Sequence, residues 1–501
     1  MLTRLQVDGF KNLLKIDIRF GPFTCIAGCN GVGKSNLFDA ISFLGALARV
    51  PLLEAALLIR GERGRSGDIR RIFHHYGAQF DPEMEFIADL IIPQSAIDDL
   101  GQHAKASYTF LRYTLKLQYR TEEIHDRSVN PIRITKEELT YLPKKEIPEN
   151  LLFKFSSRWR DSIISGKKTT KLISTESREG KTIIKLHQDG KRGGKTQSLL
   201  ASSLPRTVLS STNAAESPTA LCARREMESW MLLQLEPSAL RKPDDFTAPA
   251  ILTNNGEHLP ATLHRLASTD PERIYQQVSN DLSELISDVK EIRVDADEKR
   301  QIYTLFVKDR AGTGHPAHAL SDGTLRFLAL SIIGRDPQVQ GLICLEEPEN
   351  GIHPERIPAM LELLRNMAVD PKEPVDETNP LRQVIVNTHS PGFVGEVPDD
   401  ALVAVEKKEI KYQGNLINGI VLSAMKGTWR LSGTQNLIQT ITKNVLLSYL
   451  QPFLPKNDNA SSAVKQKNDD VEKRVFDRYV EQMDFLKEHK VAEPNADYGK
   501  N

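Results

Sequence analysis

Three short runs in this sequence combine residue types that bind phosphates, hold a metal ion and activate water. The first is GCNGVGKS at residues 28–35, which matches the phosphate-binding pattern G-x-x-x-x-G-K-[ST]. It follows the apolar run Phe23–Ala27 and opens an apolar periodic segment, the strand-to-helix context that this motif requires. The sequence therefore predicts a P-loop that binds ATP.

Each position of the loop has a separate physical role. Gly28, Gly31 and Gly33 let the backbone turn tightly and bring bare N–H groups against phosphate oxygens. The start of the following helix favours an anion. We expect Lys34 to bridge the β- and γ-phosphates and the Ser35 hydroxyl to bind Mg²⁺.

The second run places two carboxylates at the end of an apolar strand. Residues 341–345 (GLICL) form the strand, and Glu346 and Glu347 follow it. Adjacent acids beside a buried strand are costly unless a cation or a proton transfer needs them. We expect Glu346 to hold the Mg²⁺ water shell and Glu347 to orient or deprotonate the attacking water.

The third run is NTHSP at residues 387–391, after the apolar strand Gln383–Val386. A lone histidine at a strand end is more often structural. Here the order of P-loop, acidic strand and strand with histidine favours a contact from His389 to the γ-phosphate.

A fourth segment, LSDGT at residues 320–324, starts a helix at Leu325–Ile333. Ser321 or Asp322 can cap this helix, which is sufficient reason for their presence. A helix start at Ser321, Asp322 and Gly323 can also offer a hydroxyl and N–H groups to a phosphate. We expect that phosphate to belong to the nucleotide of a second protomer, so that hydrolysis requires a homodimer.

The elements that must position these residues indicate an α/β fold. We expect a mixed sheet with a P-loop core, an antiparallel lobe, an inserted α/β region and a helical C-terminal tail. The predicted elements are strands at Leu5–Val7, Ile16–Phe20 and Phe23–Ala27, a helix at Ser35–Leu47, antiparallel strands from about 80 to 120, a helical segment from about Ser217 to Leu235 and a strand pair near Lys290–Val307.

Four regions follow from this pattern. Residues 1–125 and 290–425 are expected to form the two halves of one ATPase head, and residues 126–289 an inserted region for contact with DNA or a partner. Residues 426–501 form an extension with a polar linker and an amphipathic helix, whose apolar side carries Val475, Tyr479, Val480, Met483 and Leu486. That helix suits docking to a partner or folding back on its own domain equally well.

Composition excludes several classes of protein. The 501 residues have a formal net charge of zero, so affinity for nucleic acid needs a local patch. The four cysteines (Cys25, Cys29, Cys222 and Cys344) form no CxxC pair, which argues against a disulfide framework or a structural zinc site. The N-terminus carries charges where a signal peptide needs an apolar run, and no apolar run reaches membrane-spanning length. We expect a cytoplasmic protein without membrane contact.

The best candidate for contact with double-stranded DNA is the stretch Lys154–Lys195, with 12 Lys or Arg against 4 Asp or Glu. Solvated hairpins are the alternative. Reversing the charges of Lys167, Lys168 and Lys171 is expected to weaken DNA binding. The neighbouring pairs His74-His75 and Arg224-Arg225 have no partners at metal-ligand spacing, and we expect structural roles for both.

Taken in order, GCNGVGKSN, LSDGT, LICLEEPENGIHP and NTHSP resemble the RecF/SMC-related branch of the ABC ATPases. They are also similar to bacterial ATPases grouped with the heads of OLD-family nucleases. The resemblance covers roughly residues 1–120 and 290–425. It implies an ABC-type head that uses ATP and Mg²⁺ and closes as a dimer around two nucleotides.

The resemblance also assigns residues. Lys34 and Ser35 become the phosphate and metal contacts, Glu347 the catalytic carboxylate, Ser321 the contact in trans and His389 the switch. The loop Asn350–His353 would cross the dimer seam. The further residues implied at the ATP site are Lys11, Asn12, Asn30 and Asn36.

This sequence departs from the family pattern at two points. The first acid is usually aspartate and here is Glu346, which is one methylene longer. The glutamine of the family's Gln loop has no clear counterpart, and its candidates, Gln79 and Gln118, are each expected to be ordinary surface residues.

Three functions remain open. The first is a regulatory ATPase of an anti-phage defence system, resembling Septu-type or retron-associated ATPases that act with a separate nuclease effector. The second is a DNA-repair ATPase of the RecF type that acts on DNA ends or gaps. The third is a nucleotide-binding scaffold with negligible hydrolysis.

Overall fold

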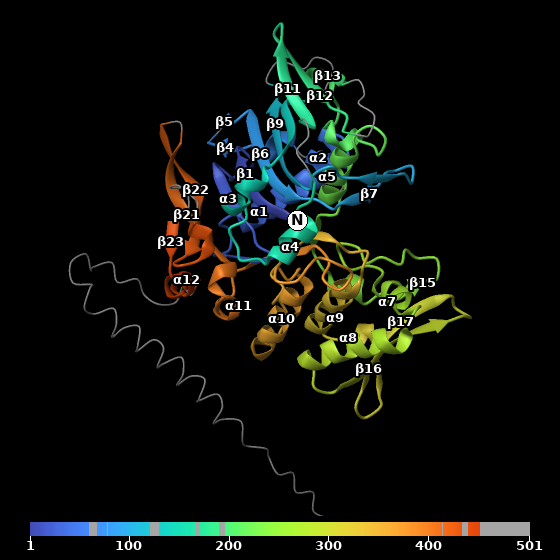
Figure 1. Ribbon diagram of the computed structural model, residues 1–501. Coiled ribbons are helices and arrows are strands. Elements are labelled where there is room, and N and C mark those ends of the chain that lie inside the picture. Colours follow the sequence, from blue (N-terminus) through green and yellow to red (C-terminus); the bar gives the residue numbers. More distant parts are fainter. Residues whose placement is uncertain are drawn as a thin grey trace, which may run out of the picture. The chain divides into compact units, whose positions relative to one another are not determined.

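The structure is a computed structural model that describes residues 1–59, 68–77, 79–120, 130–166, 171–189, 196–412, 414–432 and 439–450. Residues Met1–Leu450 form one unit (Figure 1). The predicted linker and amphipathic tail helix lie outside the described residues, as do Lys167 and Lys168 of the basic stretch.

A seven-stranded sheet forms the centre of the half that carries the GCNGVGKS loop. Its first five strands are parallel neighbours, and the sixth turns back as a hairpin partner of the fifth. In spatial order the strands are β14 (Met231–Leu233), β19 (Gly341–Glu346), β20 (Arg382–Thr388), β3 (Phe23–Ala27), β21 (Leu402–Tyr412), β22 (Asn415–Met425) and β23 (Gln439–Ile441).

The middle strands of this sheet are buried on both faces, which explains the apolar runs in β3, β19 and β20. Along β20, Ile385 points into the hydrophobic cluster that contains α1 (Lys34–Leu47). Val384 and Val386 point into a second cluster with α9 (Asp322–Arg335) and α10 (Ile357–Met367). Because successive side chains of a strand point to opposite faces, this one sheet contributes to two hydrophobic cores.

An eight-stranded antiparallel sheet packs on the α1 side. Its polar and apolar residues alternate, as Leu5 and Val7 are buried while Arg4 and Gln6 are half-buried. In spatial order the strands are β13 (Gln197–Leu200), β12 (Lys181–Leu186), β11 (Ile173–Arg178), β10 (Ile132–Tyr141), β9 (Phe110–Tyr119), β6 (Glu83–Ile91), β1 (Leu2–Asp8) and β2 (Ile16–Arg19). The expected boundary at residue 125 falls between β9 and β10, which pair along most of their length.

The two sheets share α1 as a common packing element. The ring of Phe43, on α1, lies 5.7 Å from that of Phe10 and 5.8 Å from that of Phe86 on β6. Burying these aromatic side chains stabilises the join strongly, because each removes a large apolar area from water. Helix α1 is therefore packed between the two sheets.

Helices cover the opposite face of the central sheet. In Figure 1, the yellow-green helix α8 (Pro271–Leu285) packs against α9 and the orange helix α10, beside a small sheet. That sheet consists of β15 (Asp244–Asp245), β17 (Ile302–Asp309), β16 (Val289–Asp297) and β18 (Gly314–Pro316). The other described elements are α2 (Leu52–Leu58), α3 (Ile147–Asn150), α4 (Ser157–Ile163), α5 (Pro218–Glu228), α6 (Pro237–Leu240), α7 (Leu259–Ala267), α11 (Pro391–Glu396), α12 (Lys443–Leu450) and the hairpins β4 (His75–Tyr76) with β5 (Gln79–Phe80) and β7 (Ser95–Ile97) with β8 (His103–Lys105).

One predicted element is wrong in part. The helical segment expected up to Leu235 ends at Glu228, and Met231–Leu233 is instead the edge strand β14. Met231 and Leu233 pair in register with Ile343 and Leu345 of β19. Pairing with a neighbouring buried strand overrides the weak helical preference of this short apolar run.

The topology gathers the ends of three strands. Because β3, β20 and β19 are parallel neighbours, their carboxyl ends Ala27, Thr388 and Glu346 meet at the same edge of the sheet. Ligands in open α/β sheets bind at such an edge. The loops that follow these three strands form the candidate site.

Candidate functional site

The loop after β3 has the shape of a phosphate cradle. Gly33 (φ 108°) and Gly31 (φ 76°) lie in the left-handed region that favours glycine. A Cβ at Gly28 would lie 2.4 Å from the carbonyl oxygen of Val405, and one at Gly33 would lie 2.2 Å from the amide nitrogen of Asn12. The glycines therefore permit both the turn and the close approach of neighbouring segments.

Lys34 is held at the mouth of this loop. Its Nζ donates to the carbonyl oxygens of Gly28, at 2.6 Å, and Cys29, at 2.9 Å. Burial lowers the pKa of Lys34, while the nearby Glu347 carboxylate acts in the opposite direction. Phosphate oxygens are stronger acceptors than carbonyls, so a triphosphate can take over these hydrogen bonds.

Two asparagines brace the loop from the side. The Asn36 amide donates to Oδ1 of Asn12 at 2.8 Å, and the Asn12 amide donates to the Val32 carbonyl at 3.3 Å. Lys11, which is predicted to lie near the nucleotide, contacts α1 in this structure. Its Nζ forms an ion pair with Asp39 of α1 at 2.7 Å, and it does not line the cleft described below.

The acidic end of β19 is linked to the histidine at the end of β20. Oε1 of Glu347 lies 2.7 Å from Nδ1 of His389, and Oε2 accepts from the Asn350 side chain at 2.7 Å. The Glu347 N–H donates to the backbone oxygen of Asn387 at 3.0 Å. Glu347 has φ 48°, a conformation that costs a non-glycine residue on the order of 1–3 kcal/mol. Such strain needs firm support, and these hydrogen bonds supply it.

A second set of hydrogen bonds joins the loop after β19 to the loop after β20. The hydroxyl of Thr388 donates to Oε1 of the buried Glu349, and the Ser390 N–H donates to that hydroxyl at 2.9 Å. Burial raises the pKa of Glu349, and the bond from Thr388 opposes the shift. The segments that carry Glu347 and His389 are thus tied together on both sides.

One cleft of about 680 Å³ brings most of the predicted residues together. It is lined from the P-loop side by Asn12, Asn30, Gly31, Gly33, Lys34, Ser35 and Asn36, from the acidic strand by Leu345, Glu346, Glu347, Pro348 and Asn350, and elsewhere by Leu233, Gln234, Leu235, Glu236, Arg326, Leu330 and Asn387. His389 contacts the cleft through Glu347.

The donor set fits a magnesium ion held mainly by a bound nucleotide. Mg²⁺ is usually bound through one or two protein groups, with phosphates and water completing its shell. The Ser35 hydroxyl and the Glu346 carboxylate line the same cleft and are groups of this kind. Within the described part of the chain, no cluster of three or more His, Cys, Asp or Glu could hold a metal without such help.

The sequence prediction missed Gln234, which lies in the cleft directly after β14. The two earlier candidates lie elsewhere: Gln79 belongs to the β5 hairpin, and Gln118 bonds to Glu83 and Arg133. The apolar run Met231–Leu233 followed by Gln234 is the pattern of a strand that ends in a glutamine. The prediction of a helix over this run excluded that interpretation.

The segment at the start of α9 lies outside this cleft. Ser321 caps the helix, with its Oγ accepting from the Thr324 N–H at 3.2 Å, and both Ser321 and Asp322 are exposed. Arg241 holds the segment by bonds to Asp322, at 2.5 Å, and to the Leu320 carbonyl, at 3.0 Å. The capping role is therefore real, and the exposed groups remain accessible from outside the protomer.

The described part of the basic stretch gives mixed support for a nucleic-acid surface. Lys185 and Arg178 both pair with Glu176, at 2.6 Å and 3.5 Å, so part of the positive charge is neutralised. Trp159 is fully buried, in contact with the ring of Phe153, and is not available for stacking on bases. Lys167 and Lys168 fall outside the described residues.

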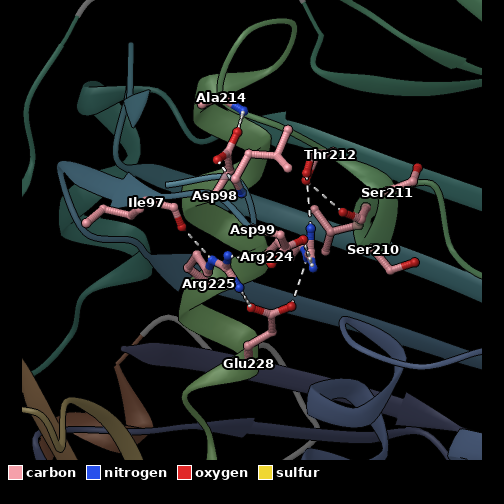
Figure 2. Close-up of polar contacts among 12 residues, drawn as sticks. Ile97, Asp98, Asp99, Ser210, Ser211, Thr212, Ala214, Arg224, Arg225 and Glu228 are labelled. Atoms are coloured by element: carbon pink, nitrogen blue, oxygen red, sulfur yellow. Dashed lines mark hydrogen bonds and ion pairs between the residues drawn. The ribbon is translucent and has the colours of Figure 1, made fainter. Parts of the chain in front are cut away.

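The two paired motifs that drew attention in the sequence have structural roles, as predicted. His74 bonds through Nδ1 to the Lys11 carbonyl at 2.6 Å. Arg224 and Arg225 of α5 both bind Asp99, at 2.9 Å and 2.7 Å, and so anchor the β7–β8 hairpin (Figure 2).

Comparison with known proteins defines the family. Residues 143–395, just over half of the chain, match the family described as "AAA domain, putative AbiEii toxin, Type IV TA system". The chain belongs to this family. Together with the RecF matches below, this confirms the predicted class, an AAA ATPase of the ABC/SMC-RecF type.

Two curated relatives are named DNA replication and repair protein RecF. The protein from Haemophilus ducreyi is 35% identical over 80 residues, which is 16% of this chain and 18% of the relative. The protein from Paenarthrobacter aurescens is 36% identical over 77 residues, 12% of this chain and 19% of the relative. The chain thus covers less than a fifth of each relative.

Similar solved structures include SMC heads. One is an Smc head bound to the C-winged helix domain of ScpA, with 14% identity, 85% of this chain and 98% of that chain covered, and a TM-score of 0.41. For the SMC head domain from Thermotoga maritima, the identity is 13%, 84% of this chain and 98% of that chain are covered, and the TM-score is 0.34.

No helix in the described ranges is long and apolar enough to cross a bilayer.

Proposed function

We propose that this protein binds and hydrolyses ATP as a homodimer that encloses two nucleotides between its protomers. The observation that carries the proposal is the shared cleft, in which Lys34 and Ser35 of the P-loop face the same space as Glu346 and Glu347. A cleft with a phosphate cradle, metal donors and a possible base is suited to phosphoryl transfer to water.

The residues divide the chemistry among themselves. The P-loop N–H groups and Lys34 hold the phosphates, while Ser35 and Glu346 hold Mg²⁺. When bound, the ion neutralises charge that develops on the transferred phosphoryl group. Glu347 accepts the proton of the attacking water, and His389, 2.7 Å away, fixes the carboxylate and faces the γ-phosphate.

Gln234 takes the role of the missing glutamine in this scheme. It stands at the edge of the cleft after β14, next to the acidic strand in the sheet. An amide side chain can accept from a water molecule and donate to a phosphate at the same time. We assign Gln234 to orienting the attacking water, together with Glu347.

The second protomer completes the site. Ser321 and Asp322 are exposed at the start of α9 and do not line the cleft of their own chain. A helix start offers N–H groups to an anion, so the exposed Ser321 and Asp322 can meet the γ-phosphate held by the partner's P-loop, while Gly323 is buried against Gly351 of its own chain. The loop Asn350–His353 would then lie at the seam.

We place this ATPase in bacterial anti-phage defence, as the regulatory or sensor subunit that acts with a separate nuclease. The family description names a toxin of a Type IV TA system, and the motif order is similar to that of defence ATPases. In this proposal, the nucleotide state of the ATPase gates the effector.

A RecF-like role in DNA repair is the second candidate. The specific observation in its favour is the similarity to RecF over about 80 residues. Double-stranded DNA would meet the basic stretch Lys154–Lys195, with affinity that falls as salt rises. Reversing Lys167, Lys168 and Lys171 should weaken this binding, and unchanged binding at low salt would remove the idea.

One experiment separates these functions. Glu347→Gln protein is purified from cells that carry its neighbouring genes, and its native mass is measured with and without ATP and DNA. An ATP-dependent even-numbered assembly with a co-purifying chain supports the defence role, and a dimer that gains mass only with DNA supports repair. A monomer in saturating ATP contradicts the shared site.

A further inference from the structure

Arg326 is a residue of the nucleotide cleft to which neither the motifs nor the comparisons assign a role. It lies on the second turn of α9, five positions after Ser321, and lines the same cleft as Lys34. Its Nη1 donates to the carbonyl oxygen of Asn350 at 3.0 Å. Its Nε is buried without a hydrogen-bond partner among the described residues.

Asn350 connects this arginine to the proposed catalytic carboxylate. The Asn350 side chain donates to Oε2 of Glu347 at 2.7 Å, and its N–H donates to the Glu347 carbonyl at 3.0 Å. The carbonyl of the same residue accepts from Arg326. One residue is thus held by Arg326 on one side and holds Glu347 on the other.

The loop after β19 is also pressed against the first turn of α9. A Cβ at Gly323 would lie 2.2 Å from the carbonyl oxygen of Gly351, so the two backbones are in direct contact. Gly323 and Arg326 are three positions apart and share one face of the helix. α9 therefore grips the loop at two adjacent residues, Asn350 and Gly351.

Glu347 depends on such support more than an ordinary side chain does. Its φ of 48° is strained, and a strained residue keeps its position only while its surroundings hold it. A displacement of about 1 Å at a reacting group can cost about 10²-fold in rate. A small shift of α9 is therefore enough to change the activity of Glu347.

We propose that Arg326 is a positioning residue, which holds Glu347 in its reactive place through Asn350. This inference rests on the proposed ATPase function. The start of the same helix carries the exposed Ser321. A group that binds at Ser321 can therefore change hydrolysis of the nucleotide that the same protomer holds, through Arg326 and Asn350. A shift of the first turn of α9 also moves Arg326 on the second turn. Through its hydrogen bond, Arg326 then moves the loop of Asn350.

The test compares three arginine variants and an asparagine variant. Arg326→Met keeps the apolar stem and removes all donors, and Arg326→Lys keeps a cation that can reach the Asn350 carbonyl. Asn350→Ala removes the side-chain bond to Glu347. Arg365→Met, on the exposed face of α10, is the matched control for loss of an arginine. The measurements are kcat, KM and the equilibrium affinity for ATP.

Arg326→Met is expected to lower kcat about 10²-fold with ATP affinity within about twofold of wild type. Arg326→Lys should restore most of the rate, and Arg365→Met should match wild type. Adding Arg326→Met to Asn350→Ala should lower kcat little further, because both changes break one path.

Three results would overturn the proposal. They are wild-type kcat in Arg326→Met, additive effects in the double variant, and a loss of ATP affinity as large as the loss of kcat, which would mean direct phosphate binding. Failure of the proposed function has a different signature. In that case the wild-type protein itself does not hydrolyse ATP, and none of the variants differs from it.

Discussion

Glutamine in place of Glu347 keeps the shape of the side chain and removes its capacity to accept a proton. In the structure one carboxylate oxygen faces His389 Nδ1 and the other accepts from Asn350, each at 2.7 Å. Glutamine can keep the bond from Asn350 with its carbonyl oxygen. The fold of the loop should therefore survive, and the loss should fall on the chemistry.

The size of the effect follows from the role. General bases contribute about 10²- to 10⁴-fold, so kcat should fall by that factor, or about 3–5 kcal/mol in activation free energy. ATP binding should remain, because the P-loop groups are unchanged.

The assay is phosphate release in a single turnover, with native mass measured on the same samples. Glu362→Gln, an equal change of charge on the exposed side of α10, serves as the control and should behave as wild type. Glu347→Gln should form an ATP-dependent dimer that persists for hours. A rate within about threefold of wild type would refute the assignment of Glu347 as the general base. It would favour the third function, a nucleotide-binding scaffold with negligible hydrolysis.

Three further predictions concern the cradle, the dimer and the core. Gly28→Ala should lower the free energy of unfolding by about 3 kcal/mol or more and abolish ATP binding, because its Cβ would lie 2.4 Å from a backbone oxygen. Gly31→Ala, whose Cβ meets open space, should lower the free energy of unfolding by only about 1 kcal/mol, as measured by thermal unfolding. Lys34→Ala and Ser321→Arg proteins should each be inactive, and mixing them should restore hydrolysis, because the heterodimer contains one intact composite site; no recovery would contradict a site shared in trans. Burial raises the pKa of Glu137 to about 7, so the stability that its protonated form supports is complete below about pH 4.5 and is lost as the pH rises through about 7. Urea unfolding at pH 5 and pH 8 should show a difference of about 3 kcal/mol that Glu137→Gln reduces, and an unchanged difference would contradict this role.

Most residues that meet at the candidate site could be predicted from the sequence because its motifs are local. A P-loop is one turn between a strand and a helix, and its glycines, Lys34 and Ser35 act within eight consecutive residues. The acidic run and the histidine each follow an apolar strand in the same way. Parallel packing of those strands then brings Glu347 and His389 together at one sheet edge.

The residues that were missed reach the cleft from elsewhere in the chain. Gln234 enters it only because Met231–Leu233 pairs beside β19 as an edge strand, a pairing that no local pattern announces. The ion pair of Lys11 likewise joins segments apart in the chain, because its partner Asp39 is 28 residues away.

The sequence by itself therefore determined the class of protein, the phosphate cradle and the paired acids, since short-range backbone geometry and strand order produce them. Tertiary structure alone decided which long side chains enter the cleft and how the loop of Asn350 is gripped by α9. The physical reason is reach. Arginine, lysine and glutamine side chains extend several ångströms, and the partner that captures each one is set by packing between segments far apart in the chain.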